Sequence, residues 1–118
     1  MIVEDSEDMQ SIYRDMFSTE SGYEIDIDSD ACSALDKVCK DPKKYDLIIL
    51  DIIMEPMSGD AFFIHLRAHE STKHIPVIVV SVLERSVLET LTKIENIEIL
   101  EKPLNREELF GALHKVLQ

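Results

Sequence analysis

Residues 45–59 read YDLIILDIIMEPMSG, and this stretch decides the fold. Residues 47–50 are a continuous apolar run between polar neighbours, which is typical of a strand buried on both faces of a parallel sheet. Asp51 follows the run directly, and Pro56 and Gly59 mark a turn shortly after it. Ligands of open α/β sheets bind at the carboxyl ends of the strands. The stretch therefore predicts a functional carboxylate at that edge.

Strands and helices alternate on both sides of this stretch. Ser6 is a good N-cap for a first helix, and Asn105 with Glu108 forms a capping-box-like start for the last one. The alternation predicts an α/β fold, a doubly wound parallel sheet in one domain spanning residues 1–118. The predicted strands cover residues 2–3, 23–27 at the sheet edge, 47–50, 77–80 and 97–100, and the predicted helices cover residues 6–17, 31–38, 58–69, 87–94 and 105–117. The short first strand is either minimal or the end of a strand that starts further upstream.

The composition limits the partners and the location. A net charge of −12 disfavours nucleic acid and anionic lipid as direct partners, because phosphate contacts require Lys and Arg. No apolar run approaches the roughly 20 residues that cross a bilayer, and no secretion signal follows Met1. Cys32 and Cys39 lie about 10 Å apart along one predicted helix, which is too far for a disulfide. We expect a soluble cytoplasmic protein without membrane contact.

Polar side chains follow four of the predicted strands. They are Glu4 and Asp5, Asp51, Ser81, and Lys102. Because the carboxyl ends of parallel strands meet at one edge, these groups are expected to lie together. Crowded carboxylates favour a cation, and Mg²⁺ binds through one or two carboxylates. The set predicts a Mg²⁺ site in which Lys102 and Ser81 stabilise a phosphoryl group and Asp51 acts as the nucleophile.

Each of these residues taken alone has a structural interpretation, as a turn, cap or solvated loop residue. A metal-dependent enzyme is another alternative, because His65 and His69 share a helix face and His74 is nearby. The segment HLRAH lacks the glutamate that a zinc protease uses as its base. The three glycines of the chain form no phosphate-binding loop, which argues against a nucleotide hydrolase.

The chain resembles the receiver domain of bacterial two-component response regulators, including the chemotaxis regulators, over its whole length. The resemblance rests on the acidic pair in IVEDS, the aspartate in LIILDIIM, the hydroxyl ending IVVS and the KP dipeptide, which occur in the family's order and spacing. It implies a flavodoxin-like sheet with strand order 2-1-3-4-5 and helices on both faces. It also implies a phosphoprotein of signal transduction rather than an enzyme with its own substrate.

By this resemblance, Asp51 accepts a phosphoryl group from a histidine kinase or a phosphotransfer protein. The Mg²⁺ ligands would be Glu4, Asp5, Asp51 and the backbone carbonyl of Ile53. Ser81 and Lys102 would contact the phosphoryl group.

The resemblance also implies how the signal leaves the site. Ser81 and Ile99 occupy the switch positions, and the bond between Lys102 and Pro103 is a candidate cis peptide. A face formed by the fourth helix, the fifth strand and the fifth helix would engage an output domain or protein, or form a phosphorylation-dependent dimer.

Several residues depart from the family pattern. Glu55 stands where proline is usual, Val82 where Ala or Gly is usual, and Ile99 where an aromatic residue is usual. These departures keep open a degenerate receiver that acts as a docking module without phosphorylation. Ile53 and Leu83 cannot orient an attacking water, so slow self-dephosphorylation is expected.

Overall fold

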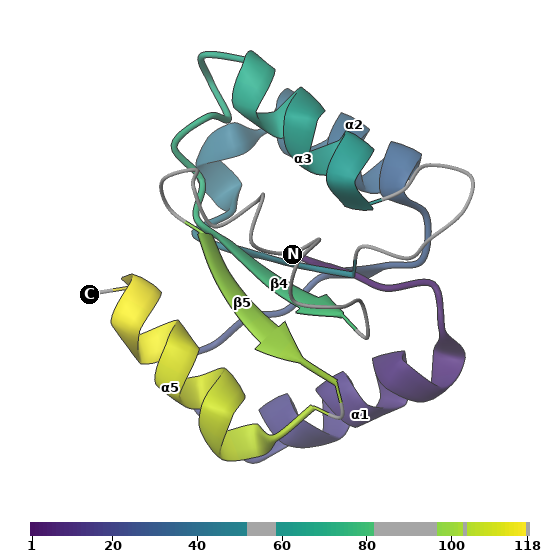
Figure 1. The fold of residues 1–118 in the computed structure, drawn as a ribbon, viewed down its shortest axis with the longest axis vertical. Coiled ribbons are helices and arrows are strands. Elements are labelled where there is room, and N and C mark those ends of the chain that lie inside the picture. Colours follow the sequence, from purple (N-terminus) through teal and green to yellow (C-terminus); the bar gives the residue numbers. More distant parts are fainter. Residues whose placement is uncertain (52–58, 82–96, 103, 118) are drawn as a thin grey trace.

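The computed structural model describes residues 1–51, 59–81, 97–102 and 104–117. Its centre is a parallel sheet with the strand order β2-β1-β3-β4-β5, which confirms the predicted fold class (Figure 1). The strands are β1 (Ile2–Val3), β2 (Ile27–Asp28), β3 (Ile48–Leu50), β4 (Val77–Ser81) and β5 (Ile97–Glu101). Because all the pairs are parallel, all the strands end at the same edge of the sheet.

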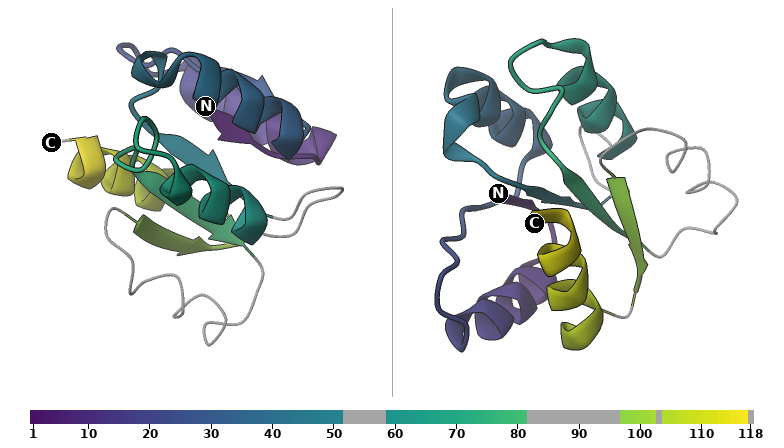
Figure 2. Two further views of the ribbon diagram at one scale, coloured as in Figure 1. Left: turned by 90° about the horizontal axis from the view of Figure 1, so that it is seen from above. Right: turned by 90° about the vertical axis from the view of Figure 1, so that its left-hand side faces the viewer.

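Helices cover both faces of the sheet (Figures 1 and 2). The described helices are α1 (Glu7–Ser18), α2 (Ala31–Lys40), α3 (Gly59–Ala68) and α5 (Arg106–Leu117), with a short 3₁₀ turn, η1 (Pro42–Lys44), after α2. Helices α2 and α3 lie on one face, and α1 and α5 lie on the other. The predicted helix over residues 87–94 lies outside the described residues. No helix in the described part of the chain is long and apolar enough to cross a membrane.

The alternation of side chains along the strands divides the interior into two cores. In β4, Val77 and Val79 pack towards α2 and α3, whereas Ile78 and Val80 pack towards α1 and α5. All four side chains have no exposed surface. Burying each such side chain contributes about 1.5–3 kcal/mol, so both faces of this strand favour the layered arrangement. This is why β3 and residues 77–80 of β4 are apolar at every position rather than at every second one.

Side chains cap the helices that begin near the carboxyl edge of the sheet. Ser6 accepts a hydrogen bond from the backbone N–H of Met9 at 3.3 Å and starts α1. Asp30 accepts from Cys32 N–H at 2.8 Å and starts α2. Asn105 accepts from the N–H groups of Glu107 and Glu108 before α5. Such caps satisfy N–H groups that have no partner inside the helix, and they fix where each helix leaves the loop.

The edge strand β2 is shorter than its sequence pattern predicts. The alternation from residue 23 to residue 27 predicts a strand, but the structure has strand geometry only at Ile27–Asp28. The parallel ladder pairs Ile27 with Ile2 and Asp28 with Val3, and β1 offers only these two residues. A strand needs a partner for its backbone groups, so the pairing partner sets its length here.

Candidate functional site

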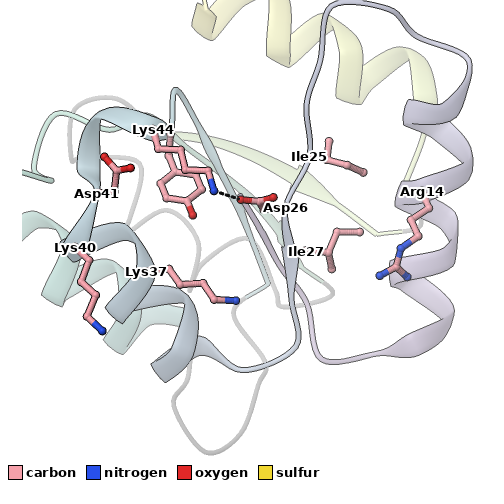
Figure 3. A pocket seen from close by; sticks show the side chains of 9 residues that line it. Arg14, Ile25, Asp26, Ile27, Lys37, Lys40, Asp41 and Lys44 are labelled. Atoms are coloured by element: carbon pink, nitrogen blue, oxygen red, sulfur yellow. Dashed lines mark ion pairs between the residues drawn. The ribbon is translucent and has the colours of Figure 1, made fainter.

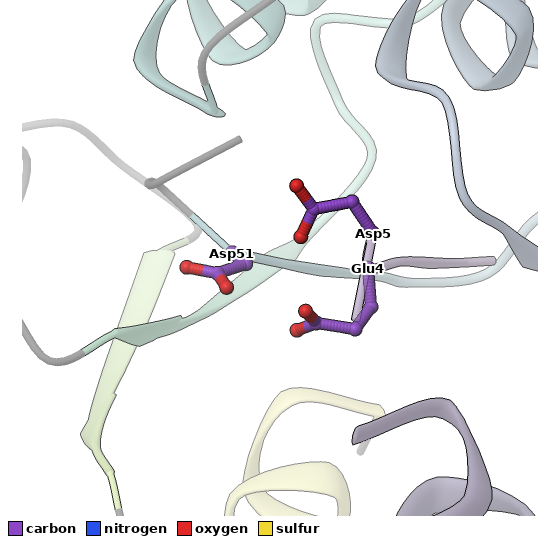
Figure 4. A group of neighbouring side chains, drawn as sticks. All are labelled: Glu4, Asp5 and Asp51. Atoms are coloured by element: carbon purple, nitrogen blue, oxygen red, sulfur yellow. The ribbon is translucent and has the colours of Figure 1, made fainter. Parts of the chain in front are cut away.

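The carboxylates that follow β1 and β3 lie side by side at the carboxyl edge of the sheet. Val3 is paired with Leu50 in the ladder, so Glu4 and Asp51 leave the two strands at the same level. The backbone N–H of Asp51 donates to the carbonyl of Val3 at 3.3 Å, which continues this alignment. Carboxylate oxygens of Glu4, Asp5 and Asp51 lie within 4.8 Å of one another (Figure 4). The topology therefore concentrates negative charge at one point, here called the acidic edge.

The three carboxylates differ in their contact with water. Glu4 has 1% of its surface exposed and Asp51 has 6%, whereas Asp5 is exposed. Glu4 points under the sheet edge towards α1 and α5, and Asp5 points to the other side (Figure 4). A small cation could thus be bound from the protein side and still keep water ligands on the solvent side, which is how Mg²⁺ is usually held.

Lys102 places an ammonium group against the two buried acids. Its Nζ lies 2.8 Å from Asp51 Oδ2 and 3.7 Å from Glu4 Oε2, and its side chain is 17% exposed. The lysine stands directly after β5, where its backbone N–H donates to the carbonyl of Ser81 at 3.0 Å. Among the described residues, Glu4 and Asp51 thus share this one ammonium, and with the Asp5 carboxylate nearby the acidic edge keeps an excess of negative charge.

The environment of Glu4 disfavours the charged form of its carboxyl group, first through burial and then through the neighbouring acids. Its Oε1 accepts from Ser6 N–H at 3.2 Å, but its buried Oε2 has no hydrogen-bond partner among the described residues. Burial raises the pKa of Glu4 from 4.5 to about 7, with the nearby charges of Asp51 and Asp5 adding to the rise and the Ser6 amide and Lys102 opposing it. A buried carboxylate oxygen that lacks a hydrogen bond and has its ammonium 3.7 Å away is one that a divalent cation would satisfy. The residues present therefore fit Mg²⁺, which prefers oxygen ligands.

Ser81 and Ile99 lie on the neighbouring strands. Ser81 ends β4, next to β3, and is completely buried, so the structure places its hydroxyl-bearing residue at the same edge as the carboxylates. Ile99 sits in the middle of β5 and packs, half-buried, against the core under α2 and α3. Ile53, Glu55, Val82, Leu83 and Pro103 lie outside the described residues. The roles predicted for those five, including the cis peptide, stay predictions.

Sequence reasoning missed two contacts that hold residues 4–5, here called the acidic loop. Ser6 is predicted as a helix cap, but its backbone N–H also binds the Glu4 carboxylate. Gln10 on α1 carries no prediction, yet its Nε2 donates to the backbone carbonyl of Glu4 at 2.7 Å. A signal existed in principle, because a long amide side chain in the first turns of a helix can reach back to the preceding loop.

Other groups that could have formed a site are dispersed or paired. His65, His69 and His74 are exposed, and in the described part of the chain only Glu4, Asp5 and Asp51 form a metal-competent group. A hollow of about 620 Å³ lies beside β2 and is here called the β2 hollow (Figure 3). It is lined by Arg14, Ile25, Asp26, Ile27, Lys37, Lys40, Asp41, Lys44 and Tyr45.

The lysines of the β2 hollow already have acidic partners. Lys44 pairs with Asp26 at 3.2 Å, as Figure 3 shows, and Lys37 pairs with Asp28 at 3.0 Å. Lys40 pairs with Asp36 at 2.9 Å. The hydrogen bond from Lys44 lowers the pKa of Asp26. The charges of this hollow are thus balanced locally, and the acidic edge is the stronger candidate site.

Comparison with known proteins agrees with the geometry of this edge. Residues 1–114 match the response regulator receiver domain family. The chain belongs to this family, whose members are modules of two-component signalling.

Particular relatives show where such domains occur. The chain is 34% identical over 118 residues to the sensor histidine kinase TmoS of Ectopseudomonas mendocina, covering 99% of this chain and 12% of that protein. It is 28% identical to the response regulator ArlR of Staphylococcus haemolyticus, covering all of this chain and 52% of that protein. The chain thus spans at most about half the length of these curated relatives.

Solved structures show the same fold. The chemotaxis protein CheY4 of Vibrio cholerae superposes with a TM-score of 0.84 at 26% identity, over 98% of this chain and 95% of that one. The receiver domain of the sensor histidine kinase PA1611 of Pseudomonas aeruginosa gives a TM-score of 0.84 at 22% identity, over 98% of this chain and 93% of that one. That structure has a magnesium ion coordinated in its active site cleft.

Proposed function

We propose that residues 1–118 form a receiver domain in which Asp51 accepts a phosphoryl group from a histidine kinase or a phosphotransfer protein. The observation that carries the proposal is the acidic edge itself. Two buried carboxylates and one exposed carboxylate meet there, and Lys102 lies 2.8 Å from the aspartate that would react. The family membership supports the reaction, and the packing at this edge supports the placement of its parts.

The chemistry is a transfer between two side chains. A carboxylate oxygen of Asp51 forms a bond to phosphorus while the P–N bond of the donor's phosphohistidine breaks. The departing imidazole nitrogen keeps the electron pair and takes up a proton. A Mg²⁺ ion bound by Glu4, Asp5, Asp51 and the carbonyl of Ile53 would neutralise charge on the phosphoryl oxygens.

Lys102 and Ser81 supply the remaining contacts in this proposal. The Lys102 ammonium already lies against the aspartate, so it needs little movement to contact a phosphoryl oxygen. Ser81, buried at the end of β4, would donate its hydroxyl to another oxygen.

A response to phosphorylation can pass from these two residues into β5. The Lys102 N–H and the Ser81 carbonyl are hydrogen-bonded at 3.0 Å, so the ends of β4 and β5 are directly connected. Ile99 lies in the middle of β5 and would shift with them. We propose that phosphorylation shifts the balance between two conformations of the face that contains β5, α5 and the predicted fourth helix. In the favoured conformation, this face engages an output domain, a separate protein or a second copy.

The test is phosphorylation by a small donor, followed by intact-protein mass spectrometry. The wild-type domain is incubated with acetyl phosphate and Mg²⁺, and the expected result is the gain of one phosphoryl group. Asp51→Asn is expected to gain none, and Asp46→Asn, which removes an exposed carboxylate before β3, serves as the matched control and is expected to react like the wild type. Absence of the phosphoryl mass in the wild type would favour the docking module instead.

A further inference from the structure

We propose that Gln10 is a positioning residue for the cation site, acting through the peptide bond between Glu4 and Asp5. The inference rests on the proposed function, because it concerns the same Mg²⁺ site. Gln10 stands in the first turns of α1 and is half-buried. Its side-chain Nε2 donates to the backbone carbonyl of Glu4 at 2.7 Å, a bond that spans six positions of the chain.

The carbonyl that accepts this hydrogen bond lies in the peptide unit that joins Glu4 to Asp5. The Glu4 carbonyl and the Asp5 N–H belong to one planar peptide unit, so fixing the oxygen fixes the direction in which the Asp5 Cα leaves the strand. On its other side, Glu4 is held by its N–H, which donates to the carbonyl of Asp28 on β2 at 3.0 Å. Glu4 is therefore attached to the sheet by one backbone group and to α1 by the other.

Asp5 depends on this attachment more than its neighbour does. The Glu4 carboxylate is buried and held by Ser6 N–H, whereas the Asp5 side chain is exposed and makes no hydrogen bond or ion pair among the described residues. A solvent-exposed aspartate on a loop samples several directions unless its backbone is restrained. The Gln10 amide is the side-chain contact that restrains the peptide carrying Asp5.

The bond is not needed to begin the helix. The Ser6 hydroxyl already caps α1 through Met9 N–H, and the Gln10 backbone N–H donates to the Ser6 carbonyl at 2.9 Å in the ordinary helical pattern. Removing only the Gln10 amide leaves both of these bonds. Losing the Gln10 amide should therefore change the geometry of the acidic loop and leave the start of α1 unchanged.

The main experiment measures Mg²⁺ affinity by calorimetry for the wild type, Gln10→Met and the control Ser11→Met. Methionine keeps the length and helix preference of glutamine but has no N–H donor. Ser11 is exposed on the same helix. We expect Gln10→Met to weaken Mg²⁺ binding roughly fivefold, the equivalent of one ordinary hydrogen bond, and Ser11→Met to leave it unchanged. Circular dichroism confirms that each variant is folded at the temperature of measurement.

Two further variants separate positioning from other roles. Gln10→Glu also lacks the donor but adds a carboxylate that attracts Mg²⁺, so the difference between Gln10→Glu and Gln10→Met gives the electrostatic contribution separately from positioning. In an Asp5→Asn background, Gln10→Met is expected to have little further effect, because its influence passes through Asp5.

The outcomes also distinguish the two proposals. If the wild type binds Mg²⁺ and Gln10→Met binds it equally well, the role of Gln10 is wrong while the proposed function stands. The positioning role is equally overturned if Gln10→Met has its full effect without the Asp5 carboxylate. A wild-type domain that binds no Mg²⁺ overturns the proposed function and this inference with it.

Discussion

The acidic edge and the β2 hollow contain similar kinds of charged groups, but they balance them differently. In the β2 hollow, Lys44 and Lys37 each pair with an aspartate, and both lysine side chains are more than half exposed. At the acidic edge, two of the three carboxylates are buried, and Lys102 is the cation that the described residues place beside them. The Lys44–Asp26 pair is exposed on both sides and contributes little, and the buried Asp28 has the Lys37 ammonium 3.0 Å away, so neither aspartate requires a further cation. Buried, unbalanced charges raise the energy of the free protein and favour a bound cation, which is why function is expected at the acidic edge.

The largest expected difference between the two regions appears when Mg²⁺ is added. A ligand that binds only the folded state stabilises it by about 2.7 kcal/mol at a hundred times its dissociation constant. We expect Mg²⁺ at this concentration to raise the free energy of unfolding of the wild type by this amount, as measured by denaturant unfolding. The increase should be much smaller in Asp5→Asn. Lys44→Met, in the β2 hollow, should show the full shift. A free energy of unfolding that does not depend on Mg²⁺ would remove the distinction between the regions.

Removing the cation from the acidic edge is expected to have the next largest effect. Lys102→Met leaves Glu4 and Asp51 without their ammonium partner. The pair is intermediate between buried and exposed, so the metal-free domain should lose about 2 kcal/mol of stability. Because the uncompensated carboxylates attract a cation more strongly, Mg²⁺ should restore more stability in this variant than in the wild type. Chemical denaturation in EDTA and in Mg²⁺ measures both quantities, and equal curves for variant and wild type in EDTA would contradict the expectation.

The raised pKa of Glu4 predicts a pH dependence of stability in the metal-free domain. The folded-state pKa of about 7 exceeds the usual value of 4.5, so the folded protein holds this proton more tightly than the unfolded chain does. Stability is therefore highest below about pH 4.5 as far as this group is concerned, and it falls as the pH rises towards 7 and above.

Glu4→Gln tests this directly. The variant should be more stable than the wild type in EDTA at pH 8, by on the order of 1–2 kcal/mol, with the advantage vanishing as the pH falls below about 4.5. Mg²⁺ binding to the wild type near pH 7 should release a proton, which calorimetry in buffers of different ionisation enthalpy detects. A Glu4→Gln variant that is less stable than the wild type at pH 8 would show that the ionised Glu4 carboxylate does not destabilise the folded domain.

The smallest effect is expected in the β2 hollow. Lys44→Met removes an exposed ion pair with Asp26, and solvent already screens that pair. The midpoint temperature of thermal unfolding should change little, and phosphorylation by acetyl phosphate should proceed as in the wild type. A Lys44→Met variant that lost phosphoryl uptake would show that the two regions are coupled.

The sequence predicts the framework well where the signal is local. The apolar run before Asp51, the β-branched run before Ser81 and the caps at Ser6 and Asn105 depend on neighbouring residues, and the structure has strands or helices at each of these places. The extent of β2 depends instead on a partner strand far away in the chain, so periodicity alone overestimated it. Local patterns specify elements, whereas pairing limits their length.

By itself, the sequence determined that carboxylates, a hydroxyl and an amine follow successive strands, and parallel pairing makes their meeting at one edge a geometric consequence. Only the tertiary structure decided that Glu4 is buried and Asp5 exposed, that Lys102 reaches Asp51, and that Gln10 holds the Glu4 carbonyl. The physical reason is that distance, burial and pKa depend on how several distant segments pack together. The order of residues states which groups are present, and packing sets the energies at which they interact.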